Sequence, residues 1–163
     1  MQPVAKIRVL EALRDRIALQ RAALAESQRS TQAGATHAEA KPEHAKDTRA
    51  VEASYLARGL ALRVEELDRA AALLESFEPR DFGEDEPVAV GALVGLEGET
   101  GALRIAFLSP AAGGERVEVD GREIYAVTPG SPLGRALLGR EVDDEVTVRR
   151  AGGRTTRTIA WVR

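Results

Sequence analysis

Four carboxylates that lie close together in the sequence could bind a divalent cation. Glu39, Glu43 and Asp47 lie in one polar stretch, and Glu52 follows it. Mg²⁺ prefers hard oxygen ligands, and one or two carboxylates can complete a site whose other ligands come from a second molecule. Asp47 and Glu52 would be more than about 100° apart on a continuous helix, so they converge only if Asp47 lies in a loop. Alternatively, these acids solubilise a turn and Asp47 caps a helix.

Other kinds of chemistry have few candidate residues. The chain has no cysteine, which excludes disulfides, cysteine-based zinc sites and thiol nucleophiles. Its two histidines, His37 and His44, flank Pro42, which argues against both serving as metal ligands on one helical face. A Ser-His-Asp triad would have to take its base from this polar stretch, which is a poor place for a catalytic base.

Charge and hydropathy restrict the possible partners. The 163 residues include 23 Lys and Arg against 26 Asp and Glu, a formal net charge of -3, which argues against nucleic-acid binding by bulk charge. Nowhere do about 18 apolar residues follow one another, so we expect a soluble, cytoplasmic protein. A basic cluster, interpreted as a solvated strand edge in preference to a nucleic-acid patch, comprises Arg149, Arg150, Arg154 and Arg157.

Residues 1–80 are predicted to form an antiparallel helical hairpin that carries the acidic stretch at its tip. Of the 15 glycines, only Gly34 and Gly59 precede residue 80. Apolar residues recur at steps of four and three, as in a coiled coil. The first arm contributes Leu10, Leu13, Ile17 and Leu24, and the second Ala53, Ala57, Leu60, Val64, Leu67, Ala71 and Leu74. A polar turn over 30–46 places the tip near 30–48 and predicts a monomer; a coiled-coil dimerisation module is the alternative.

Residues 81–163 are predicted to form a second domain, a small antiparallel sheet with one short helix, which makes the fold class α+β. Ser131 and Pro132 suit a helix start, and Gly139 suits its end. Leu133, Leu137 and Leu138 would form the apolar stripe of this helix. Period-two patterns and turn signals predict strands at 88–96, 103–107, 116–119, 123–127, 145–149 and 155–162.

The helical hairpin, the run Ser131-Pro132-Leu133-Gly134-Arg135-Ala136-Leu137-Leu138-Gly139 and its continuation to Val146 together resemble the bacterial Gre transcription elongation factors. The resemblance implies an FKBP-like C-terminal domain that sits on RNA polymerase near its secondary channel, with the hairpin inserted into that channel. An acidic tip would help the polymerase's active site hold a second Mg²⁺ ion and cleave backtracked RNA. Such a factor binds no cofactor stably, has no catalytic residues of its own, and meets the nucleic acid of the elongation complex only indirectly.

The resemblance also suggests a docking surface. Thr128, Pro129, Gly130, Ser131 and Pro132 would form part of the contact with polymerase, although Ser131 and Pro132 also suit a simple helix start. Family members often carry Asp or Asn two residues before the proline, where this chain has Gly130.

The tip departs from the register of cleavage-promoting Gre factors. When Ala53 and Tyr55 are aligned with the family motif, Thr48 and Val51 occupy the positions of its two key acids. Two functions therefore remain open: cleavage stimulation through Asp47, Glu52, Glu43 or Glu39, or regulation by occupying the channel without stimulating cleavage.

FKBP-like folds also suggest prolyl isomerisation as a different class of function. Such a site needs an aromatic-lined pocket. Only Phe107, Tyr125 and Trp161 lie within the predicted sheet, with Phe82 at its edge, so this pocket would have few aromatic side chains.

Overall fold

The computed structural model describes residues 4–38, 46–83, 85–150 and 152–163. The chain forms two compact units, one of Ile17–Ala72 and one that joins Met1–Arg16 to Leu73–Arg163. This grouping differs from the expected division at residue 80, because the first turns of one helix and the last turn of the next belong with the sheet.

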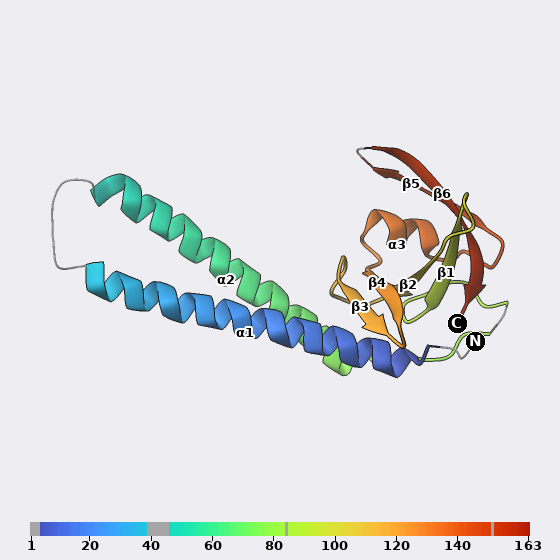
Figure 1. Cartoon of the computed structure of the whole chain (residues 1–163), viewed down its shortest axis with the longest axis horizontal. Helices are drawn as coiled ribbons and strands as arrows, with labels where there is room; N and C mark the ends of the chain where they lie inside the picture. The colour runs from blue at the N-terminus through green and yellow to red at the C-terminus, as the bar shows by residue number, and fades with distance from the viewer. Residues whose placement is uncertain (1–3, 39–45, 84, 151) are drawn as a thin grey trace. The chain divides into compact units, whose positions relative to one another are not determined.

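The unit Ile17–Ala72 is made of two long antiparallel helices, as predicted (Figure 1). They belong to α1 (Lys6–Ala38) and α2 (Lys46–Ser76). Ile17 and Leu67 are buried and Leu24, Leu60 and Val64 are half-buried, as expected for the apolar seam, whereas Ala57 of that seam is exposed.

Polar contacts supplement that seam between the two arms. Gln20 interrupts the apolar pattern, and its side-chain oxygen accepts a hydrogen bond from Arg63 of the opposite arm at 3.1 Å. Arg21 pairs with Asp68 at 2.5 Å. The polar residue that interrupts the apolar pattern, Gln20, therefore forms a contact between the two arms.

Helix α1 extends further than the sequence indicated. The polar turn was expected to begin at Ser30, but the helix continues to Ala38. Gly34 lies within it, and a single glycine costs a helix only about 1 kcal/mol among alanines, which favour helix most. Of the predicted tip, residues 39–45 lie outside the described residues.

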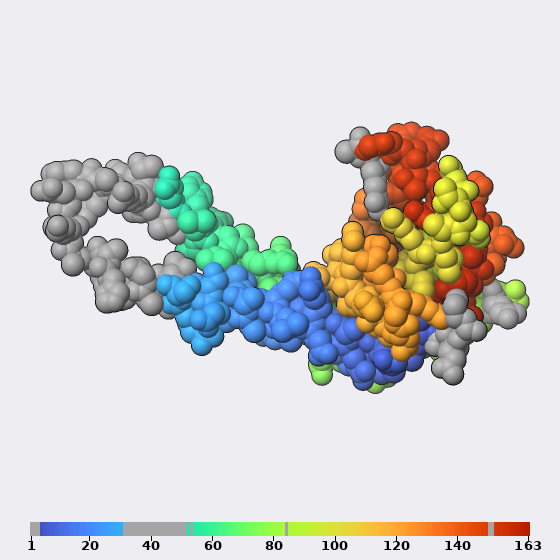
Figure 2. All heavy atoms as spheres, viewed as in Figure 1, coloured from blue at the N-terminus to red at the C-terminus, as the bar shows by residue number. Residues whose placement is uncertain are grey.

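The second unit contains a six-stranded sheet in the order β3-β4-β2-β1-β6-β5. Its strands are β1 (Leu93–Gly98), β2 (Leu103–Leu108), β3 (Arg116–Val119), β4 (Arg122–Val127), β5 (Glu145–Arg150) and β6 (Gly153–Val162). In Figure 2 the yellow atoms of β2 lie between the orange atoms of β3 and β4 and the red atoms of β5 and β6. The sheet is antiparallel as predicted except between β2 and β4, which are parallel. The chain leaves β2, reaches the sheet edge as β3, and returns as β4.

Two turns show how local chemistry sets the strand boundaries. Asp120 and Gly121 both have positive φ, 54° and 70°, so the predicted Asp-Gly hairpin between β3 and β4 is confirmed. Gly91, at φ 96°, bends the chain beside the Phe77 ring, and β1 begins only at Leu93. This bend divides the segment that was expected to form one strand from Val88.

The short helix α3 (Pro132–Leu137) packs on the sheet and ends one residue earlier than its apolar stripe suggested. Leu137 is fully buried, whereas Leu138 adopts a non-helical ψ of 128° and is 39% exposed. The expectation that Leu138 belongs to the buried stripe is therefore wrong. The core between α3 and the sheet comprises Val88, Ala92, Val94, Leu96, Ala106, Leu108, Val127, Leu137, Val146, Ile159 and Val162.

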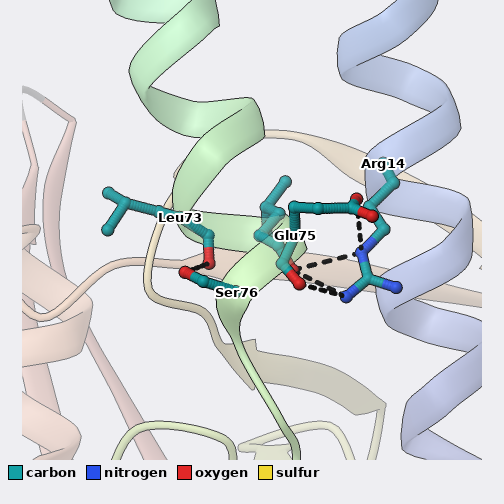
Figure 3. A network of polar contacts seen from close by, with 5 residues as sticks. Arg14, Leu73, Glu75 and Ser76 are labelled. Carbon is teal, nitrogen blue, oxygen red and sulfur yellow. Dashed lines mark hydrogen bonds and ion pairs between the residues drawn. The ribbon is translucent and has the colours of Figure 1, made fainter.

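Residues of α1 are anchored within this same unit, which explains why Met1–Arg16 groups with the sheet. Arg14 donates from Nε and Nη2 to the Leu74 carbonyl at 3.1 and 2.8 Å, and Nη2 also donates to the Glu75 carbonyl (Figure 3). These carbonyls end α2 and have no partner within the helix, so the guanidinium acts as a cap. Arg16 pairs with Glu115 at 3.0 Å, and Arg8 with Asp120.

Candidate functional site

The loop predicted to dock on polymerase, Thr128–Pro132, is fixed by the start of α3. Ser131 is the N-cap, and its Oγ accepts from the Gly134 N–H at 3.0 Å while donating to the Thr128 carbonyl at 2.8 Å. The Ser131 N–H donates to the same carbonyl at 3.0 Å. Pro132 occupies the first turn, where a missing N–H costs nothing. Both expected helix-start roles are confirmed.

Two glycines pack closely against Thr128 of the same loop, one from α3 and one from the segment before β3. A Cβ on Gly134 would lie 1.9 Å from the Thr128 carbonyl oxygen, so only glycine fits there without movement. A Cβ on Gly113 would lie 2.8 Å from Thr128 Oγ1. Arg135 also donates to the Gly130 carbonyl. Gly130 and Pro132 are exposed, so the loop presents a fixed surface to solvent.

Ser131 and Pro132 also line a cavity of about 480 Å³ in the second unit, which the sequence did not indicate. Its charged lining residues are four arginines from four strands: Arg104 of β2, Arg116 of β3, Arg149 of β5 and Arg157 of β6. Among the residues that the structure describes, no acidic side chain lines it. Apolar lining residues include Leu96, Ile105, Val127, Leu133, Val146 and Val148.

This cavity divides the basic cluster noted in the sequence. Arg149 and Arg157 line it, Arg154 does not, and the Arg150 side chain lies outside the described residues. Arg104 and Arg116 come from distant strands, so no local spacing could have assigned them to the same site. The nearest sequence signal was the pair Arg149 and Arg157, which lie on paired strands.

If this cavity were a prolyl isomerase site, Tyr125 would be the one aromatic side chain among its described lining residues. Tyr125 lines it, whereas Phe107 is fully buried and Trp161 does not belong to the lining. Arg104 and Arg116 lie 5.5 and 5.0 Å from the centre of the Tyr125 ring. The ring is thus already engaged by two cations, which leaves little aromatic surface for a proline.

The structure places two of the four acids predicted at the hairpin tip. Asp47 is the second residue of α2, and Glu52 lies further along the same helix with an exposed side chain. The condition that Asp47 lies in a loop is therefore not met, and the two positions are about 140° apart around the helix axis. The other two acids, Glu39 and Glu43, lie outside the described residues, as does His44. Within the described part of the chain, no group of three or more metal-ligating side chains gathers.

Two groups with displaced pKa values lie together at the segment that follows α2. Burial lowers the pKa of Lys6, whose Nζ lies 4.4 Å from the centre of the Phe82 ring and donates to the Arg80 carbonyl. The pKa of Glu86 is lowered mainly because its carboxylate accepts a hydrogen bond from the Gly83 N–H at 3.0 Å. A second hydrogen bond, from Arg80, lowers this pKa further. These contacts hold Arg80, Gly83 and Glu86 to one another and to Lys6, so we assign them a structural role.

Comparison with known protein families finds a match, which lies in the C-terminal part of the chain. Residues 115–163 match the family described as "Transcription elongation factor, GreA/GreB, C-term", a stretch that includes α3, its preceding loop and the strands from β3 to β6. No curated protein matches the sequence. No helix in the described residues combines the length and apolar character needed to cross a membrane.

Solved structures similar to this chain include two Gfh1 proteins and one GreA/GreB factor. Gfh1 of Thermus thermophilus is 20% identical, with 93% of this chain and 95% of that chain covered and a TM-score of 0.38. Gfh1 of Thermus aquaticus is 21% identical, with coverage of 93% and 94% and a TM-score of 0.39. GreA/GreB from Nitrosomonas europaea is 22% identical, with coverage of 69% and 92% and a TM-score of 0.37.

The family match covers the part of the sheet domain that carries α3 and the loop before it. Residues 115–163 are thus similar to the C-terminal part of GreA/GreB factors, which supports the resemblance based on the Ser131–Gly139 run.

Proposed function

We propose that this protein binds bacterial RNA polymerase, with the sheet domain docked near the secondary channel and the helical hairpin inserted into that channel. The observation that carries this proposal is the family match over residues 115–163. The helices add physical support, because α1 and α2 have 33 and 31 residues and are each about 45–50 Å long. Two paired helices bury little apolar area for their length, so reach explains their length better than stability does.

In this proposal the docking contact involves the loop Thr128–Pro132. Ser131, Gly134 and Arg135 already fix its backbone through hydrogen bonds or close approach. Binding by a fixed loop loses little conformational entropy, so more of the contact energy remains as affinity. With glycine at position 130, this part of the contact relies on backbone and shape, because no side chain is available there.

At the hairpin tip, we propose that one carboxylate helps the polymerase to hold Mg²⁺ and cleave backtracked RNA. The donor type fits, because a carboxylate oxygen is a hard ligand and Mg²⁺ accepts one or two carboxylates beside other ligands. The positions of Asp47 and Glu52 on one helix do not favour both as ligands of one ion. At most one of these two residues would therefore contribute a charge to the polymerase's active site, and Glu39 and Glu43 are the other candidates.

The separation of Asp47 and Glu52 around α2 favours a second function, in which the protein regulates transcription without stimulating cleavage. A hairpin whose described tip acids do not share a helix face can occupy the channel and exclude other factors without stimulating cleavage. In that case regulation depends on docking and on the hairpin, and the acids at the tip only keep it solvated.

An assay of RNA cleavage in stalled, backtracked elongation complexes distinguishes the two functions. We expect wild-type protein to release short 3′ RNA fragments, and the double variant Asp47→Asn with Glu52→Gln to lose this activity with polymerase binding nearly intact. The matched control is the double variant Asp15→Asn with Glu65→Gln, which removes two exposed charges far from the tip. If wild type releases no fragments but competes with a cleavage-active factor, the channel-occupying function is correct. Failure of wild type to bind polymerase would refute both.

A further inference from the structure

We propose that the arginine-lined cavity beside α3 receives an acidic segment of the partner protein, with apolar side chains on the cavity floor and carboxylates on the arginines. This inference rests on the proposed docking to RNA polymerase and specifies the chemistry of the contacted element. The cavity arginines are defined as Arg104, Arg116, Arg149 and Arg157.

The charge of the cavity is opposite to that of the whole chain. The protein has a net charge of -3, yet four arginines and no acid line this one cavity. Arg116 is partly compensated by Glu123 at 3.8 Å, and Arg157 makes contacts of its own. Arg104 and Arg149 form no ion pair with any residue that the structure describes, and both are exposed. Arg104 lies over the Tyr125 ring, but neither guanidinium has a carboxylate partner among the described residues, so both can pair with a carboxylate of a partner protein.

The rest of the lining favours a protein segment. Leucine, isoleucine and valine side chains form an apolar floor, and Ser131 and Pro132 connect the cavity to the proposed docking loop. An apolar centre with a charged rim is the usual composition of a protein–protein contact. Arginine pairs with carboxylates through two parallel hydrogen bonds, which gives such a rim its selectivity.

Nucleic acid fits the cavity less well. Single-stranded nucleic acid is bound by aromatic rings on which bases stack, together with a basic groove. Tyr125, the aromatic residue of the lining, is already engaged by Arg104 and Arg116, and its hydroxyl donates to Glu123. A cavity of about 480 Å³ is also compact, whereas single-stranded nucleic acid is bound along an extended basic groove.

The test measures binding of the full chain to core RNA polymerase over a series of salt concentrations. The variant is Arg104→Gln with Arg149→Gln, and the matched control is Arg140→Gln with Arg163→Gln, two exposed arginines of the same unit outside the cavity. We expect the variant to bind about tenfold more weakly at low salt and to show a shallower salt dependence, because rim charges steer association. The control should stay within about twofold of wild type. Far-UV circular dichroism and Trp161 fluorescence check that every variant is folded.

The outcomes separate this inference from the proposed function. If wild type does not bind polymerase, the proposed function fails. If wild type, variant and control all bind equally, docking stands and the acidic-segment inference is wrong. A fluorescent single-stranded oligonucleotide provides the second probe: tighter binding by wild type than by the Arg104→Gln/Arg149→Gln variant would identify nucleic acid as the occupant and overturn the inference.

Discussion

Replacing Gly134 by alanine tests whether the start of α3 sets the geometry of the docking loop. The new Cβ would lie 1.9 Å from the Thr128 carbonyl oxygen, whereas a carbon and an oxygen in contact are about 3.3 Å apart. The carbonyl must therefore move by about 1.4 Å. Because this atom is backbone, with two bonds from Ser131 on it, we expect a cost near the upper end of overpacking, about 3 kcal/mol.

Thermal unfolding followed by the fluorescence of Trp161, the sole tryptophan, measures this cost. For a domain of this size, about 3 kcal/mol corresponds to a fall in Tm of about 12 °C or more. Gly130→Ala is the matched control, since its Cβ would meet no atom within 4 Å, and we expect a change within about 0.5 kcal/mol. Polymerase affinity of the folded Gly134→Ala protein should also fall. Equal Tm values for the two variants would refute the assigned role of the close approach.

Three further substitutions test other parts of the structure. Leu67→Ala should reduce the stability of the hairpin by about 3 kcal/mol because Leu67 is 3% exposed, whereas Leu62→Ala, at 53% exposure, should change it by less than about 0.5 kcal/mol; equal losses of helical circular dichroism on heating would contradict this. Glu86→Gln should flatten the fall in stability as pH drops below the ordinary glutamate pKa of about 4.3. The lowered pKa of Glu86 gives stability that is present above its unfolded-state pKa and is lost as pH falls through the folded-state pKa. An unchanged acid limb in unfolding curves would count against this role. Arg14→Met should cost about 1–2 kcal/mol in urea unfolding through the uncapped Leu74 carbonyl, and an unshifted midpoint would show that water replaces the cap.

The features that the sequence predicted correctly depend on neighbours along the chain. The seam through Ile17 and Leu67 follows from a repeat of seven, and a helix start at Ser131 follows from one capping residue and one proline. The Asp120-Gly121 turn is set by two residues that tolerate positive φ. Each of these signals acts within one or two turns of chain, so composition and spacing are sufficient to find it.

The features that were missed depend on tertiary packing. Pairing of β2 with β4 is parallel because β3 occupies the edge, and no residue in either strand encodes that order. The cavity arginines meet only after six strands are arranged, so Arg104 and Arg116 carried no signal. Leu138 matched the apolar spacing, but the helix ends before it and the side chain turns outward. The loop at 128–132 was predicted by family resemblance, while its fixed geometry comes from Gly134 and Gly113.

The position of β6 between β1 and β5 has a consequence for how the protein is made. During synthesis, β1 leaves the ribosome with its outer edge unpaired, and its partner is the sixth strand in chain order. Until Ile159 and Val162 arrive, the apolar floor of the domain stays open on that side and the nascent chain exposes a strand edge prone to aggregation. Proteolytic trimming of a few residues from this strand would also remove an interior strand of the finished sheet. Completion of the sheet thus depends on β6, the last of its strands in chain order.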